Sequence, residues 1–154
     1  MQRRSVLKAA LATPLLASIA QPAWAQESDL IYLSPIKSDG GLSSCQAEIW
    51  YVFDGSDYYV VTGAGAWRAR AITKGLTQAQ IWVGNVGRWQ QADEKWLRLP
   101  SVMASASIAE DPATHERLLT IFGRKYADEW GSWGPRFKKG LADGSRVMLK
   151  YSPA

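Results

Sequence analysis

Short runs of apolar and aromatic residues, separated by turn sequences, predict an antiparallel sheet. Residues 48–53 (EIWYVF) and 58–62 (YYVVT) are rich in the β-branched and aromatic side chains that strands favour. The DGSD sequence between them is typical of a tight turn. We therefore expect a hairpin here. Further strands are expected over residues 80–84, 96–99 and 147–151.

Two segments have the pattern of helices. Residues 67–74 follow a glycine-containing turn and end before Gly75, a residue type common just beyond a helix. In the second segment Asp111 can cap a helix and Pro112 suits its first position. Apolar residues then recur there at helical spacing, at Leu118, Leu119, Phe122 and Tyr126. Residues 130–136 (WGSWGPR) are expected to form a loop, because they include Gly, Ser and Pro.

The expected order is strand, strand, helix, strand, strand, helix, strand. Hairpins and closely spaced strands favour antiparallel pairing. We therefore predict a mainly β fold with two helices, in which the strands form a small antiparallel barrel and the helices pack against it.

The start of the chain has the features of an export signal. Basic residues precede a short apolar stretch, and the segment ends in the cleavage-type sequence Ala23-Trp24-Ala25. The apolar stretch is about half of the ~20 residues that a membrane span needs, so stable membrane insertion is not expected. We predict a signal peptide over residues 1–25 and a single domain over residues 26–154.

The sequence Arg3-Arg4-Ser5-Val6-Leu7-Lys8 resembles the twin-arginine export signal, which has two arginines, any residue, a large apolar residue, Leu and often Lys. This resemblance implies export by the twin-arginine machinery, which moves folded proteins, many of them loaded with a cofactor. The expected location is the periplasm or the outside of a bacterial cell. The alternative is an ordinary secretory signal that contains two arginines.

The basic charge of the chain arises in this first segment. The chain has 18 Lys and Arg against 14 Asp and Glu, a net charge of +4. The first 25 residues contain three of these cations and no acidic residue, so the remaining chain has 15 against 14. A nearly neutral domain lacks the basic excess that nucleic-acid binding requires, and we expect no nucleic-acid partner.

Few residues could support hydrolytic or metal chemistry. His115 is the single histidine and Cys45 the single cysteine, so no disulfide can form within the chain. No acidic cluster has metal-loop spacing, and the residues around Cys45 lack a nucleophile-elbow pattern. We expect neither a hydrolase nor a metal site, and we interpret His115 as an ordinary surface or half-buried residue.

The turn before the first helix could hold an anion. A strand ends at Thr62, two glycines permit a tight turn, and cations follow at Arg68, Arg70 and Lys74. Free backbone N–H groups at a helix start and arginine side chains both attract phosphate. Arg70 and Lys74 are also four residues apart, and a bound dianion would relieve their repulsion. In the alternative interpretation, the three cations only solvate one face of the helix.

Seven tryptophans follow the signal segment. We interpret Trp50 and Trp96 as core residues of the barrel. Trp130 and Trp133 fall in the expected loop, where two exposed indoles would suggest a lid over a flat ligand or an interface with a second subunit.

The segment from Glu48 to Gly84 resembles the FMN-binding split β-barrels related to pyridoxamine 5′-phosphate oxidase. The similarity consists of a hairpin with an Asp-Gly turn, a strand that ends in Thr62, and a short basic helix. That helix opens with Ala66-Trp67-Arg68, where the family has a Ser-Arg-Lys-like triplet.

The resemblance implies a small antiparallel split β-barrel that binds FMN. Thr62 and Arg68, helped by Arg70 or Lys74, would hold the phosphate. The flavin ring would lie across a homodimer interface, packed by Trp82 and by the partner's Trp130 and Trp133 loop. The family commonly has basic residues on the first of these strands, where this chain has Glu48, Trp50 and Tyr51. A deazaflavin, a haem-type ligand and an empty barrel therefore remain alternatives to FMN.

The expected function is that of an exported FMN-dependent oxidoreductase that acts on a small-molecule substrate. One alternative is a non-enzymatic periplasmic protein that binds a small planar ligand. Another is a structural dimer without a cofactor.

Overall fold

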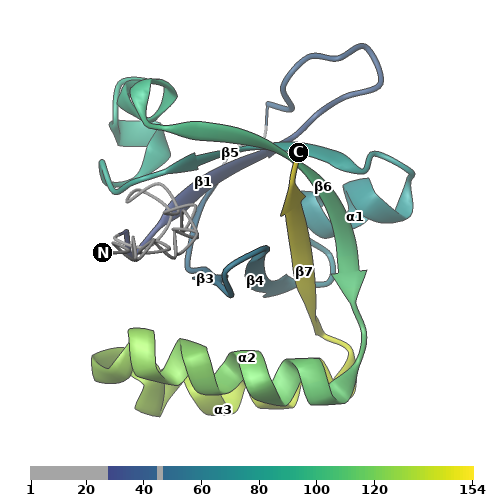
Figure 1. The fold of residues 1–154 in the computed structure, drawn as a ribbon, viewed down its shortest axis with the longest axis vertical. Coiled ribbons are helices and arrows are strands. Elements are labelled where there is room, and N and C mark those ends of the chain that lie inside the picture. The colour runs from purple at the N-terminus through teal and green to yellow at the C-terminus, as the bar shows by residue number, and fades with distance from the viewer. Residues whose placement is uncertain (1–27, 45–46) are drawn as a thin grey trace, which may run out of the picture.

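Seven antiparallel strands form one curved sheet, in the order β2-β1-β5-β6-β7-β4-β3 (Figure 1). The structure is a computed structural model that describes residues 28–44 and 47–154; the signal segment and Cys45 lie outside this part. The strands are β1 (Ile31–Pro35), β2 (Ala47–Ile49), β3 (Val52–Phe53), β4 (Tyr58–Gly63), β5 (Gln78–Val83), β6 (Ser101–Ala109) and β7 (Arg146–Pro153). The helices are α1 (Trp67–Thr73), α2 (Pro112–Lys125) and α3 (Ala127–Asp143), with two short 3₁₀ turns, η2 (Trp89–Gln91) and η3 (Lys95–Arg98).

The two edges of the sheet belong to one short stretch of chain. β2 pairs with β1 at one edge and β3 pairs with β4 at the other, and only Trp50 and Tyr51 separate them. The chain therefore passes from one edge to the other and closes the sheet into a barrel. We call Trp50 and Tyr51 the seam of the barrel.

The expected strand over residues 48–53 is thus wrong as a single element, although its end forms the expected hairpin with β4. Tyr51 has no strand partner because side chains occupy its backbone groups. Its N–H donates to the Tyr126 hydroxyl at 2.9 Å, and its carbonyl accepts from Lys125 Nζ at 2.9 Å. These contacts come from the end of α2, so a remote helix interrupts the strand.

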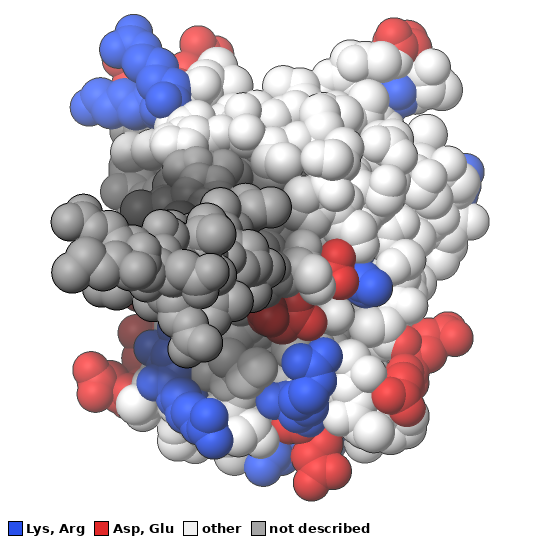
Figure 2. Space-filling view, in the orientation of Figure 1, with Lys and Arg blue, Asp and Glu red and all other residues white. Residues whose placement is uncertain are grey.

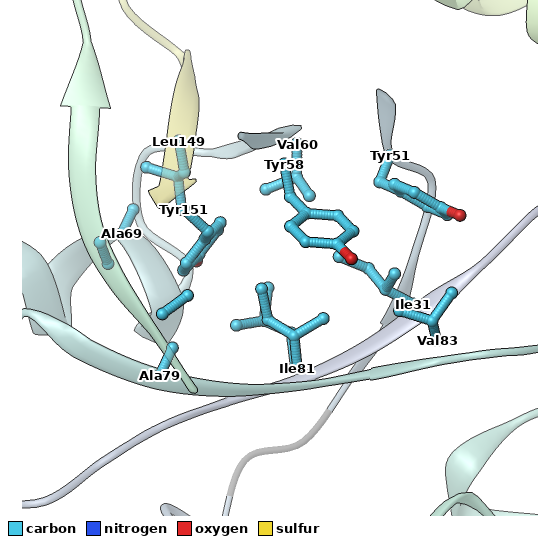
Figure 3. Close-up of a cluster of buried hydrophobic side chains, with 13 residues drawn as sticks. Ile31, Tyr51, Tyr58, Val60, Ala69, Ala79, Ile81, Val83, Leu149 and Tyr151 are labelled. Carbon is cyan, nitrogen blue, oxygen red and sulfur yellow. The ribbon is translucent and has the colours of Figure 1, made fainter. Parts of the chain in front are cut away.

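The barrel interior is filled by side chains from every wall. Tyr51, Tyr58 and Tyr151 lie above Ile81, and small residues such as Ala69 and Ala79 pack beside the Tyr151 ring (Figure 3). All of these residues are buried. The interior is therefore a packed core.

Helices α2 and α3 pack against each other as a hairpin, which lies below the barrel in Figure 1. Asp111 caps α2 as predicted, because its carboxylate accepts the Thr114 N–H at 3.0 Å, and Pro112 occupies the first turn. The hairpin packs on the outer face of the sheet, where it buries Val61 and Met148. On the face seen in Figure 2, both cations and anions lie over this hairpin.

The expected loop over residues 130–136 is wrong, because this stretch lies within α3. Gly and Pro disfavour helix in isolation. Here Trp130 lies against Gly123 and Gly134, where an added Cβ would come within 2.7 and 2.8 Å of the indole. Packing against α2 thus needs glycine at these positions, and this packing outweighs the local preference. The described residues form three α-helices where two were expected.

A segment between β5 and β6 covers the outer face of β1 and β5. It buries Trp82 and Trp96 against Tyr32, whose hydroxyl accepts the Val86 N–H at 2.9 Å. The expected strand over residues 96–99 is wrong, since this stretch forms η3. Two strands that the sequence pattern did not reveal, β1 and β6, pair with β5 on its two sides.

The other expected helices and strands agree with the structure. α1, α2, β5 and β7 lie within a few residues of the expected ranges, and the architecture is a mainly β, antiparallel, barrel-like sheet. Among the described residues, no helix is both long and apolar enough to span a membrane.

Candidate functional site

The start of α1 brings two of the predicted phosphate ligands together. Arg68 Nη1 donates to Thr62 Oγ1 at 3.0 Å, from the first turn of α1 to the end of β4. Thr62 is buried and Arg68 is half-buried. Within the described residues, no carboxylate lies within 4.0 Å of Arg68, so the remaining N–H donors of its guanidinium have no acidic partner.

The phenol of Tyr151 is close enough to Arg68 to feel its charge. Its hydroxyl is buried without a hydrogen-bond partner in the described part of the structure. Burial raises the pKa of Tyr151, and the nearby charge of Arg68 opposes this shift. The charge of Arg68 therefore acts on a buried phenol as well as on the end of β4.

The other two predicted phosphate ligands do not join this pair. Arg70 and Lys74 are exposed on α1, and they share one face because they are four residues apart. Arg70 instead lies over the Trp67 ring, with 5.9 Å from its guanidinium carbon to the ring centroid. Arg68 is two positions from Arg70 and faces the barrel, so the three cations do not converge.

Trp82, predicted to pack the flavin ring, lies on the outer face of the sheet, and Trp130 and Trp133, predicted to reach the ring from a partner subunit, lie in α3. Trp82 is buried under the segment between β5 and β6, where its ring meets Trp96 edge-on with a centroid distance of 4.8 Å. Trp130 and Trp133 are half-buried in α3 and are not on an exposed loop. Only Trp133 lines a cavity on the barrel wall.

This cavity lies between the seam and α3 and has a volume of about 310 Å³; we call it the seam cavity. Aromatic rings form much of its wall. Trp50 stacks on Tyr126 with a centroid distance of 4.2 Å, and Trp133 meets Trp50 edge-on at 6.0 Å. Phe137, Val61, Ile49 and Leu30 complete the apolar part of the lining.

Two oppositely charged side chains also line the seam cavity. Arg146, at the start of β7, lies over Trp133 and Phe137, with 5.8 and 5.4 Å from its guanidinium carbon to the ring centroids. Glu48, on β2, accepts the backbone N–H of Trp89 through Oε2 at 3.1 Å. No ion pair within 4.0 Å joins either residue to another described residue.

The seam cavity and the α1 turn are neighbours. Arg146 is the Cα partner of Gly63 in the β4–β7 ladder, and the Ala64 N–H donates to the Ser145 carbonyl at 2.9 Å. A Cβ added to Gly63 or Gly65 would meet no atom within 4 Å, so the turn has free space beside it.

A half-buried lysine supports the seam on its other side. Lys125 Nζ lies 3.4 Å from the centroid of the Tyr51 ring and 2.9 Å from the Tyr51 carbonyl oxygen. Burial lowers the pKa of Lys125 to about 8, and the charge of Asp29 opposes this shift. Burial also raises the pKa of Tyr51 to about 12.

A second, larger groove of about 810 Å³ runs between α2 and α3. Leu119, Trp130 and Leu141 line it, together with His115. His115 is half-buried and its Nε2 lies 2.6 Å from the Ala109 carbonyl oxygen, which agrees with its interpretation as an ordinary residue. Within residues 28–44 and 47–154, no three His, Cys, Asp or Glu side chains cluster as metal ligands do.

Sequence reasoning missed Arg146 and Phe137 as residues of a cavity. Because residues 130–136 were expected to form a loop, the helical spacing of the cavity residues was not recognised. In a helix, Trp133, Phe137 and Gly140 share one face, because they are spaced four and three residues apart. A Cβ on Gly140 would lie 2.5 Å from Arg146 Cγ, so this glycine makes room for the arginine stem.

No family model and no curated protein matches the chain. Solved structures do resemble it. The haem storage protein HutZ from Vibrio cholerae has a TM-score of 0.57 and 16% identity, with 85% of each chain covered. A putative pyridoxamine 5′-phosphate oxidase from Listeria innocua has a TM-score of 0.54 and 17% identity, with 85% of this chain and 88% of that chain covered.

A structure named F420 reductase has a TM-score of 0.53 and 17% identity, with 85% of this chain and 90% of that chain covered. At these identities the likeness concerns the fold. The chain thus has the split-barrel fold of the pyridoxamine 5′-phosphate oxidase-like proteins, as its sequence predicted.

Proposed function

We propose that this chain is an exported split-barrel protein that binds FMN and acts as an oxidoreductase. The observation that carries the proposal is the Arg68–Thr62 pair beside the glycine-containing turn. Arg68 is half-buried, lacks an acidic partner among the described residues and retains free donors. An arginine in this state is suited to a phosphate, which accepts paired N–H bonds from a guanidinium.

The residues present fit the phosphate of FMN in their chemistry. Thr62 accepts from Arg68 and keeps its own O–H as a donor. The glycines at positions 63 and 65 leave space beside the turn. When bound, FMN supplies hydride or electron transfer; the chain binds and orients it and shields it from water.

The names of the structural neighbours also favour a planar cofactor, since they include a putative oxidase, an F420 reductase and a haem storage protein. Haem is the main competing ligand. The described lining of the seam cavity includes no His, Cys or Met, and His115 bonds to a backbone carbonyl in the α2–α3 groove. This arrangement favours a flavin over a haem that needs an axial ligand.

The test of FMN binding compares FMN with riboflavin, which lacks the phosphate. The purified protein is expected to be yellow and to release FMN on denaturation. Arg68→Ala is expected to weaken FMN binding by about tenfold or more and to leave riboflavin binding unchanged. Arg70→Ala and Lys74→Ala, whose side chains are exposed, are expected to have smaller effects. Colourless protein that also fails to bind added FMN would refute the proposal.

A non-enzymatic protein that binds a planar ligand is the second candidate. The described lining of the seam cavity offers no general base apart from the Glu48 carboxylate. Anaerobic mixing of the flavin-loaded protein with nicotinamide donors separates the two candidates. Bleaching of the flavin bands indicates an oxidoreductase, and a spectrum that stays oxidised indicates a binding protein. Sedimentation tests the homodimer, in which a second subunit would cover the flavin ring.

A further inference from the structure

The seam cavity has the properties of a ligand site, and these do not depend on a flavin. It combines a small volume with an aromatic wall and a few charged groups, as small-molecule sites do. About 310 Å³ is near the lower limit of such sites, so the cavity suits one or two fused rings. Trp50 and Trp133, which meet edge-on, provide flat surfaces for an aromatic ring.

Arg146 determines which charge the ligand should have. Its guanidinium is half-buried and lies over Trp133 and Phe137, and within the described residues no carboxylate lies within 4.0 Å of it. A partly desolvated guanidinium without a counter-ion favours an anionic ligand group, and its planar fork matches a carboxylate. Because Gly140 has no side chain, the stem of Arg146 can pack close to α3, and this packing fixes the position of its charge.

Glu48 limits how much negative charge the cavity accepts. It lines the same small cavity, with one carboxylate oxygen bonded to the Trp89 N–H. Its negative charge repels a dianion such as a phosphate monoester more strongly than a monoanion. The seam cavity therefore differs from the Arg68 turn, where no acidic side chain lies within 4.0 Å of the guanidinium in the described structure.

We propose that the seam cavity binds a planar aromatic monocarboxylate, with its ring against Trp50 and Trp133 and its carboxylate on Arg146. This assignment goes beyond the proposed cofactor function. It gives the chain a site for a small aromatic acid as substrate or ligand.

The experiment uses two probes of nearly the same shape, 2-aminobenzoate and its neutral analogue 2-aminobenzamide. Each is titrated into the purified protein without added flavin, and binding is followed by quenching of tryptophan emission. The affinity for 2-aminobenzoate is expected to exceed that for 2-aminobenzamide by about tenfold or more. Arg146→Met, which keeps the length of the side chain and loses its charge, is expected to abolish this preference.

Arg136→Met is the matched control. The Arg136 guanidinium carbon also lies over Trp133, at 5.1 Å from the ring centroid, but this exposed arginine does not line the cavity. The Arg136→Met substitution should leave the preference for 2-aminobenzoate intact. Circular dichroism verifies that both variants fold, and Arg146→Lys, which keeps the charge, should retain part of the preference if Arg146→Met misfolds.

Equal binding of the two probes by the unmodified chain would overturn the proposal. So would a preference that persists in a folded Arg146→Met variant. Failure of FMN to bind would count against the proposed function only, because these titrations contain no flavin.

Discussion

At the scale of single residues, glycines decide where the aromatic side chains of the helical hairpin can lie. The Trp130 indole fills the space above Gly123 and Gly134. A Cβ on Gly134 would lie 2.8 Å from two atoms of this ring, too close for a rigid indole to accommodate. We predict that Gly134→Ala lowers the free energy of unfolding by about 1–3 kcal/mol, as overpacked cores do. Urea unfolding measures the change.

Gly131→Ala is the control for this prediction. Gly131 is exposed in the same helix, and an added Cβ there meets nothing within 4 Å. Alanine should therefore stabilise the protein by about 0.5–1 kcal/mol through helix propensity alone. Equal effects of the two substitutions would show that the indole does not pack as described.

Lys125 should make the stability depend on pH. Because burial lowers its pKa from 10.5 to about 8, the unfolded chain holds this proton more tightly than the folded chain. Its contribution to stability therefore rises as the pH increases from about 8 toward 10. The ordinary pKa of tyrosine is 10.0, so the measurement stays below this pH, where tyrosines of the unfolded chain begin to titrate.

Lys125→Met removes this titration. We predict that the difference in unfolding free energy between the unmodified chain and the variant grows in favour of the unmodified chain over this range. Denaturant unfolding at several pH values measures the difference. A difference that stays constant with pH would contradict the lowered pKa.

At the scale of elements, the end of α2 closes the barrel at its seam. The Tyr126 hydroxyl accepts the Tyr51 N–H at 2.9 Å and donates to the carbonyls of Asp29 and Tyr51, at 2.8 and 2.9 Å. It thus takes the place of a strand partner for Tyr51. We predict that Tyr126→Phe costs about 1–3 kcal/mol, because a buried N–H then lacks its acceptor. Hydrogen exchange of the Tyr51 amide should become faster.

Tyr151→Phe is the matched comparison within the barrel interior. It removes a buried hydroxyl that has no hydrogen-bond partner in the described structure. Loss of an unsatisfied polar group is nearly neutral or stabilising. If the two phenylalanine variants lost stability equally, the seam contacts of Tyr126 would not be responsible.

At the scale of the whole molecule, the proposed twin-arginine route requires that the chain leave the cytoplasm folded. We predict that replacing Arg3 and Arg4 together with Lys retains the protein in the cytoplasm and leaves its folded spectrum unchanged. Cell fractionation with an antibody against the folded domain measures this. Continued export of the double variant would instead indicate an ordinary secretory signal.

The barrel architecture followed from the sequence because its main signals are local. A turn with Gly and Asp residues, an Asp-Pro helix start and runs of aromatic and β-branched residues act within a few positions of one another. These signals predicted the β3–β4 hairpin, α1, α2 and β7. Thr62 and Arg68 were predicted to share one phosphate, and the structure brings them into contact because they lie at the facing ends of neighbouring elements.

Only the tertiary structure decided the rest, because the deciding contacts come from distant parts of the chain. Tyr126 and Lys125 contact Tyr51 from about 75 positions away in sequence. These contacts divide residues 48–53 between the two sheet edges. Helix α3 exists despite its glycines and proline because Trp130 packs between the two helices. The seam cavity likewise requires β2, β4, β7 and α3 to meet, and no local pattern encodes where four separate elements come together.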